Sequence, residues 1–188
     1  YAAVPQEIIT GKDIIGPNGL LATPIPVWET IFTAMFMHGS IAHIGGNMLY
    51  LWIFGDNLEN RMGHLRYLIF YLVCGVLATL SHVYLSDALG KDTLIPSLGA
   101  SGAISGVLGG YLLLFPRNKV RVLAFRYVMT VPAIVSLGIW ILLQIISGMS
   151  MFGGEGSQGG VAYAAHIGGF IAGLVLVKLF ARKVKPII

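Results

Sequence analysis

The chain has 188 residues, of which 56% are apolar and only 11% are charged. Soluble globular domains carry about 25% charged residues, so this composition excludes a soluble domain and indicates an integral membrane protein. Twelve Lys and Arg against eight Asp and Glu leave a net charge of +4, too small and too scattered to bind nucleic acid. One cysteine excludes an intramolecular disulfide. The length allows a single membrane domain, residues 1–188.

Five segments lack the charges that would prevent a helix from crossing a bilayer, which requires about 20 largely apolar residues. They predict spans near residues 38–55, 66–86, 97–115, 127–147 and 161–181. Residues 1–29 do not fit this pattern, because four prolines, three acids and one lysine interrupt them. We therefore predict an all-α bundle of five spans, with residues 1–29 forming a structured first loop at the membrane surface.

Basic residues are concentrated in three segments that five spans would place on one side of the membrane. They are the loops at 56–66 and 117–126 and the C-terminal tail, which together contain ten of the twelve Lys and Arg residues. The opposite side contains the other two cations and six of the eight acids. Because basic loops stay in the cytoplasm, we predict a plasma or inner membrane location with a cytoplasmic C-terminus. The extracytoplasmic segments are then 1–29, 87–92 and 148–160.

Three of the predicted spans carry polar side chains at a similar depth near the outer side. His43 and Asn47 lie four residues apart and therefore share one helix face in the first span. Ser101 follows two small residues near the outer start of the third span, and His166 lies a few residues below the outer end of the last span. At about 1.5 Å per residue, the common depth is on the order of 10 Å below the interface. Polar groups there usually face the protein interior, so we expect these side chains to meet.

A serine and a histidine at one depth indicate nucleophilic catalysis. A hydroxyl is a weak nucleophile until a base takes its proton, and imidazole is the usual base. Burial should keep His166 neutral and able to accept the proton of Ser101. The predicted spans contain no Asp or Glu, so a Ser-His dyad is available and a Ser-His-Asp triad is not. The backbone N–H groups of Ala100 and Ser101, with the side chains of His43 and Asn47, are placed to stabilise an oxyanion.

Less specific interpretations of the same residues remain open. A serine in a membrane helix commonly bonds the carbonyl four residues earlier, and Ser105 is a weaker nucleophile candidate on the face of Ser101. His38 and His43 could be two metal ligands, but no Cys, Asp or Glu is placed to complete a shell, so we expect no metal and no cofactor. We expect Cys74 to be an inert core residue. Glycines recur four residues apart, a spacing that favours close helix packing, at Gly102, Gly106, Gly110, Gly169 and Gly173.

Four short motifs occur in the order found in one known family. They are His38-Gly39-Ser40-Ile41-Ala42-His43 with Asn47, Glu59-Asn60-Arg61-Met62-Gly63 after Gly55, Gly99-Ala100-Ser101-Gly102, and Ala165-His166-Ile167-Gly168-Gly169 with Gly173. On these motifs, which together extend over most of the chain, the sequence resembles the rhomboid intramembrane serine proteases. The resemblance implies that Ser101 is the nucleophile and His166 its general base. It also implies that His43, Asn47 and the backbone amide of Ser101 stabilise the oxyanion.

The resemblance further implies transmembrane proteins as substrates, a lipid bilayer as surroundings, and a flexible cap formed by residues 153–160. Two departures from the family pattern stand out. The family core has six spans, and the first of them is missing before Tyr1. Some rhomboids also carry an aromatic residue one turn after the nucleophile, stacked on the catalytic histidine, where this chain has Ser105. Tyr111 and Tyr163 are candidate substitutes for positioning His166.

Three functions compete at this point. An intramembrane endopeptidase would cleave a transmembrane segment near its outer end. A catalytically inactive rhomboid-like protein that binds membrane helices would have lost the serine or the histidine, and both are present. A channel or transporter would need charged residues or broken helices in paired halves, and the predicted spans carry no charge except near their ends, at Arg66 and Lys178. The sequence therefore favours the endopeptidase.

Overall fold

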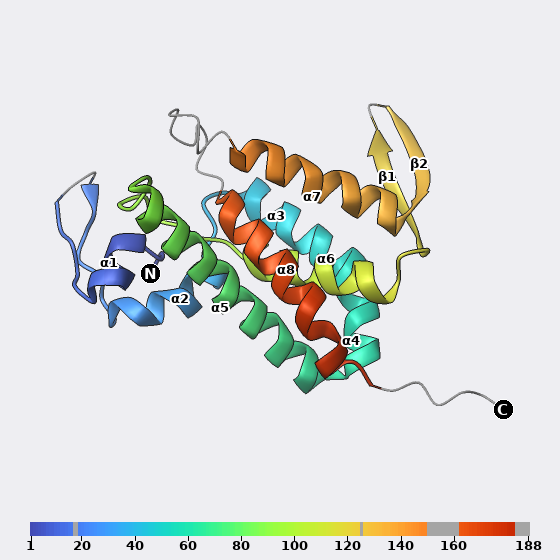
Figure 1. The fold of residues 1–188 in the computed structure, drawn as a ribbon, viewed down its shortest axis with the longest axis horizontal. Helices are drawn as coiled ribbons and strands as arrows, with labels where there is room; N and C mark the ends of the chain where they lie inside the picture. The colour runs from blue at the N-terminus through green and yellow to red at the C-terminus, as the bar shows by residue number, and fades with distance from the viewer. Residues whose placement is uncertain (17–18, 125, 150–161, 183–188) are drawn as a thin grey trace.

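The computed structural model describes residues 1–16, 19–124, 126–149 and 162–182, and within them the chain is mostly helical. In chain order the α-helices and strands are α1 (Pro5–Thr10), α2 (Thr30–Thr33), α3 (Ile41–Tyr50), α4 (Asp56–Met62), α5 (His64–Leu89), α6 (Ser101–Leu114), β1 (Lys119–Ala124), β2 (Tyr127–Pro132), α7 (Ala133–Met149) and α8 (Tyr163–Phe180). Two short 3-10 helices, Val27–Glu29 and Ala34–Phe36, flank α2. A π-helical turn, Leu51–Gly55, joins α3 to α4. Helix α1 lies at one end of the long axis, and α4 and the β-hairpin lie at the other (Figure 1).

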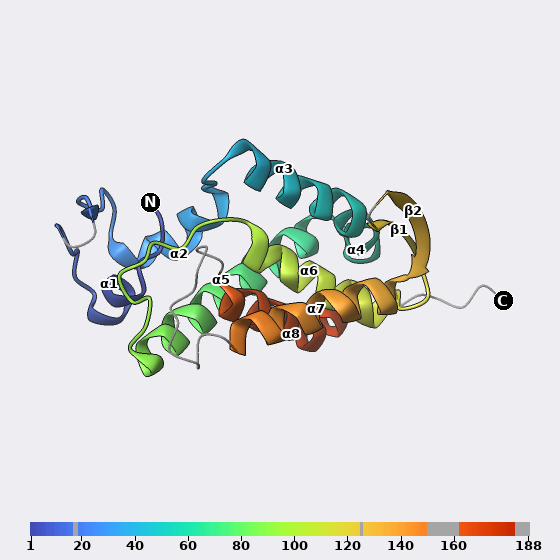
Figure 2. The ribbon, with the colours of Figure 1, turned by 90° about the horizontal axis from the view of Figure 1, so that it is seen from above.

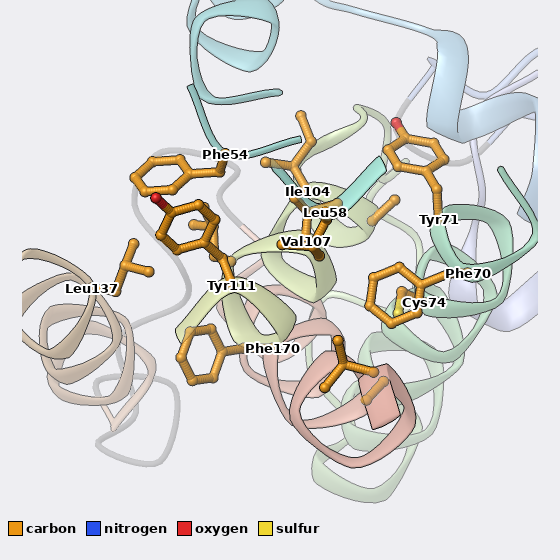
Figure 3. Close-up of a cluster of buried hydrophobic side chains, with 14 of the residues drawn as sticks. Phe54, Leu58, Phe70, Tyr71, Cys74, Ile104, Val107, Tyr111, Leu137 and Phe170 are labelled. Atoms are coloured by element: carbon orange, nitrogen blue, oxygen red, sulfur yellow. The ribbon is translucent and has the colours of Figure 1, made fainter. Parts of the chain in front are cut away.

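The core is built by α5, α6 and α8, which pack against one another more extensively than any other helices do in the described structure. Figure 2 shows α6 between α3 on one side and α7 and α8 on the other. In Figure 3, Val107 of α6 lies among buried side chains that include Phe70 and Cys74 from α5 and Phe170 from α8. The prediction that Cys74 belongs to the core is therefore confirmed.

Glycines allow α6 and α8 to approach each other. A Cβ atom on Gly169 would overlap the carbonyl oxygen of Gly102, and one on Gly173 would overlap the carbonyl oxygen of Gly106. A glycine destabilises a helix interior by about 1 kcal/mol relative to alanine, and here the close contact between backbones offsets that cost. The prediction that these glycines serve helix packing is confirmed.

Each predicted span overlaps a helix, although the limits differ. Helices α5 and α8 are long and apolar enough to cross a membrane by length and composition, while α6 and α7 are shorter apolar helices. Helix α6 begins at Ser101, whereas the predicted span begins at 97. The reason is that Ser97 pairs with Ala3 through two backbone hydrogen bonds of 2.8 and 2.9 Å, which hold the preceding segment in an extended form.

A β-hairpin corrects the all-α prediction. Strands β1 and β2 pair antiparallel, with Lys119 opposite Pro132 and Val122 opposite Met129. The second strand occupies residues that hydropathy assigned to the start of the span at 127–147. Valine, threonine and tyrosine in this stretch favour strands, and a residue that precedes proline, here Val131, disfavours the α conformation. Helix α7 therefore begins only after Pro132.

The N-terminal segment is structured and fixed to the rest of the molecule. Helix α1 packs against α5, and Gln6 donates its backbone N–H to the carbonyl of Thr93 at 2.9 Å. The buried carboxylate of Glu7 accepts hydrogen bonds from the N–H of Ile14 at 3.1 Å and the hydroxyl of Thr23 at 3.3 Å. These contacts organise the region beside the segment that leads into α6.

Candidate active site

Ser101 and His166 meet where α6 and α8 begin. Ser101 is the first residue of α6, and His166 lies in the first turns of α8. The Nε2 atom of His166 lies 2.8 Å from the Oγ atom of Ser101, a normal length for a hydrogen bond in which the hydroxyl donates. The glycine contacts described above bring these two helix ends together. A hydroxyl within hydrogen-bond reach of an imidazole is the arrangement of an activated nucleophile.

Helix α3 brings two more of the predicted side chains to this pair. The hydroxyl of Ser40 caps the helix by accepting the backbone N–H of His43 at 3.1 Å. The His43 ring lies against Gly99, where an added Cβ would be 2.8 Å from two ring atoms and 3.8 Å from Oγ of Ser101. Gly99 also has a φ of +122°, which favours glycine. Both the close approach and the backbone conformation therefore require glycine at this position.

One cavity of about 410 Å³ connects the four predicted side chains, Ser101, His166, His43 and Asn47. Asn47 is buried, and its side-chain nitrogen Nδ2 has no hydrogen-bond partner among the described residues. A buried donor without a partner is destabilising and calls for an explanation. Asn47 lines a cavity large enough for water or a peptide group.

The helix start supplies a backbone donor at the same place. Helix α6 begins at Ser101 without a side-chain cap, and the first N–H groups of a helix have no acceptor within the helix. Ser101 lines the cavity, so its N–H lies close to the nucleophilic oxygen. Ala100 is not among the described residues that line this cavity; it lines an apolar cavity between α3 and α5. The geometry therefore favours the N–H of Ser101 over that of Ala100 as an oxyanion donor.

Helix α7 supplies two residues that the sequence analysis missed. The Oε1 atom of Gln144 lies 2.7 Å from Nδ1 of His166. The ring of Trp140, one turn earlier, has its centroid 6.0 Å from that of His166, at an interplanar angle of 37°. The signal for Gln144 was present, because its amide is a polar group at membrane depth. The usual partner of a catalytic histidine is a carboxylate, and this span contains none.

The residues proposed as alternatives have other partners. The hydroxyl of Ser105 donates to the carbonyl of Ser101 at 2.7 Å, the local bond expected of a serine in a membrane helix. The Tyr111 ring packs against Phe54, and its hydroxyl accepts from Asn118 at 3.3 Å. Neither Tyr111 nor Tyr163 contacts His166 through a ring or hydrogen bond in the described part of the chain. The described contacts therefore support neither tyrosine as the residue that positions His166.

His38, Glu59 and Arg61 are not among the described residues that line the cavity beside Ser101. The rings of His38 and His43 are 5.2 Å apart in an edge-to-face arrangement, and no group of three potential metal ligands occurs among the described residues. Glu59 contacts Nδ1 of His64 at 2.6 Å, and the carbonyl of Arg61 accepts the N–H of Arg182 at 3.0 Å. These contacts fix the junction between α4 and α5. The proposed cap, residues 153–160, lies outside the described residues.

Known proteins resemble this chain over most of its length. The model of the rhomboid domain matches residues 26–183. The chain is 32% identical over 146 residues to "Rhomboid protein 1, mitochondrial" of Saccharomyces cerevisiae, covering 78% of this chain and 40% of that protein. It is 31% identical over 162 residues to "Presenilin-associated rhomboid-like protein A, mitochondrial" of Danio rerio, covering 81% and 39% respectively. It is 32% identical over 146 residues to "Rhomboid protease GluP" of Bacillus subtilis, covering 78% and 25%. These alignments span less than half of each relative.

Proposed function

Because this chain belongs to the rhomboid family of membrane proteins, we propose that it is an intramembrane serine endopeptidase. Its substrates would be transmembrane proteins, cleaved near the outer end of a membrane span. The observation that carries the proposal is the 2.8 Å contact between Oγ of Ser101 and Nε2 of His166. Both residues line a cavity that also contains two potential oxyanion donors. A protein that only binds membrane helices would not require this pair.

In the proposed reaction, Oγ of Ser101 attacks the carbonyl carbon of the scissile peptide bond while its proton passes to Nε2 of His166. The carbonyl oxygen becomes an oxyanion, which accepts hydrogen bonds from the N–H of Ser101 and the side chains of Asn47 and His43. His166 then transfers its proton to the leaving nitrogen as the C–N bond breaks, leaving an ester on Ser101. Water attacks the ester with His166 as base, and the proton returns to Ser101 as the acid product leaves.

The length of α6 supports a reaction below the membrane surface. The helix has 14 residues and is therefore about 21 Å long, whereas the hydrocarbon core is about 30 Å thick. With the far end of α6 at one interface, Ser101 lies about 9 Å below the other. This depth is consistent with the one predicted from the sequence. A substrate helix would have to unwind locally to expose a peptide bond there, because a helical carbonyl is already hydrogen-bonded.

We propose further that the chain crosses the membrane five times, with a cytoplasmic C-terminus and a site that opens on the opposite side. In support, the backbone N–H of Arg182 donates to the carbonyl of Arg61 at 3.0 Å, so two of the basic segments are in contact. The β-hairpin, which carries further basic residues, lies at the same end of the long axis (Figure 1). Helix α1 and the acidic first loop lie at the other end.

Single cysteines test this orientation. We expect Lys91→Cys to react with a membrane-impermeant thiol reagent in right-side-out vesicles, and Arg121→Cys to react only after detergent is added. The wild type is the matched control, since its one cysteine, Cys74, is buried. If Arg121→Cys reacts in intact vesicles and Lys91→Cys does not, the site would lie on the cytoplasmic side, which contradicts the proposed topology.

Covalent labelling tests the proposed activity. We expect a fluorophosphonate probe to modify the detergent-purified protein, and peptide mapping to locate the adduct on Ser101. Ser105→Ala is the matched control and should react like the wild type, because its hydroxyl is bonded to the carbonyl of Ser101. Ser101→Ala should not react. An adduct on a different serine, or an unreactive wild type under conditions that label a reference serine protease, would contradict the proposed function.

A further inference from the structure

His166 has both ring nitrogens within hydrogen-bond distance of a partner. Nε2 lies 2.8 Å from Oγ of Ser101, and Nδ1 lies 2.7 Å from Oε1 of Gln144. A neutral imidazole carries one N–H, so one of its nitrogens donates while the other accepts. Ser101 loses its proton to His166 only if Nε2 is the acceptor. Whatever faces Nδ1 therefore determines whether the histidine can act as a base.

We propose that Gln144 is a positioning residue whose side-chain oxygen accepts the Nδ1–H of His166. This contact holds the histidine in the tautomer whose Nε2 is free to receive the Ser101 proton. The role rests on the proposed function, because it concerns the same site. It also explains how the site dispenses with the carboxylate that orients histidine in a Ser-His-Asp triad. A neutral amide costs less to bury at membrane depth than a carboxylate does.

Trp140 restricts the one motion that these hydrogen bonds leave free. Two hydrogen bonds in the ring plane fix the direction in which the imidazole points. They do not prevent the ring from tilting out of that plane, which requires a contact with the face of the ring. The Trp140 ring lies 6.0 Å from the His166 ring, and at the same distance and angle from Phe170 on the same helix, α8. Trp140 and Gln144 are four residues apart and share a face of α7. A single helix thus supplies both the acceptor and the aromatic contact.

Steady-state kinetics with a transmembrane substrate test the role of the acceptor. Gln144→Met retains the length of the side chain but removes the oxygen, and we expect kcat to fall at least tenfold with KM unchanged. The loss is limited by what a general base contributes, about 10²–10⁴-fold. Gln144→Glu keeps an acceptor oxygen and should recover most of kcat. Leu143→Met is the matched control on an exposed position of α7 and should behave like the wild type.

Two kinetic outcomes would overturn the proposal. One is a kcat for Gln144→Met within twofold of the wild type. The other is a Gln144→Glu variant as slow as Gln144→Met, since the residue would then matter through its shape rather than through an acceptor oxygen.

Nitrogen-15 NMR of the imidazole rings measures the tautomer directly and needs no substrate. We expect His166 in the wild type to be protonated at Nδ1, and in Gln144→Met to be protonated partly or wholly at Nε2. The His166→Ala spectrum identifies the signals. Protonation at Nε2 in the wild type would overturn the proposal even if Gln144→Met did not fold. A wild type that fails to cleave substrate would instead contradict the proposed function and leave the tautomer result standing.

Discussion

Ser101→Ala and His166→Ala are each expected to abolish cleavage of a model transmembrane substrate while the fold stays intact. In a serine protease, loss of the nucleophile or the base lowers kcat by on the order of 10⁴–10⁶-fold. Both side chains are half-buried and line a cavity, so truncation leaves no new void inside the packed core. We therefore expect the melting temperature of each variant to remain close to that of the wild type.

The double variant makes this test sharper. Because Ser101 and His166 act as one unit, Ser101→Ala combined with His166→Ala should be no slower than either single variant. Losses that multiply would mean that the two residues act independently, which contradicts the proposed proton transfer. Ser105→Ala serves as the control and should keep most of its activity. Turnover at the wild-type rate in Ser101→Ala would show that another residue is the nucleophile.

That Ser101 and His166 lie near the starts of their helices could be predicted from the sequence, because this position depends mainly on distance along a helix. The distance of 2.8 Å between Oγ of Ser101 and Nε2 of His166 could not be predicted in that way, since it depends on how closely α6 and α8 pack. That packing depends on backbone contacts at Gly102 and Gly169, and glycine spacing alone does not say which helices are partners.

Helix limits were predictable where hydropathy and helix propensity agree. The span predicted at 66–86 lies within α5, and the span at 161–181 encloses α8. Hydropathy and helix propensity disagree at residues 127–132, where the sequence lacks charge but favours a strand. A run of uncharged residues does not distinguish a strand from the start of a helix. Pairing with β1 decides the conformation.

The missed role of Gln144 has a different origin. The absence of carboxylates from the predicted spans predicts a dyad without a third partner. The sequence does not place Gln144 beside His166, because Gln144 lies on a different helix from both Ser101 and His166 and its proximity depends on tertiary packing. Likewise, the ring that lies near His166 belongs to Trp140 on α7 rather than to a tyrosine.

Asn47→Ala is expected to lower kcat with little change in KM, because the proposed hydrogen bond forms only when the oxyanion develops. Loss of one such donor typically lowers kcat by about 10²–10³-fold. Asn47 shares its role with His43 and the N–H of Ser101, so the lower end of that range is expected. Asn47→Asp should be at least as damaging, since a carboxylate repels the developing charge and is costly to bury.

The melting temperature separates this catalytic role from a structural one. If Asn47 joined two helices, Asn47→Ala would unfold at a lower temperature and keep its kcat in the surviving fold. In the described structure the Nδ2 atom of Asn47 is buried without a partner, and removing an unsatisfied donor does not destabilise a fold through a lost hydrogen bond. We therefore expect an almost unchanged melting temperature. Asn60→Ala is the matched control, because it removes an exposed amide that bonds only Asp56 in the described structure, and it should change neither quantity. A lower melting temperature with wild-type kcat in Asn47→Ala would assign this residue to helix packing and leave oxyanion stabilisation to the backbone of Ser101 and to His43.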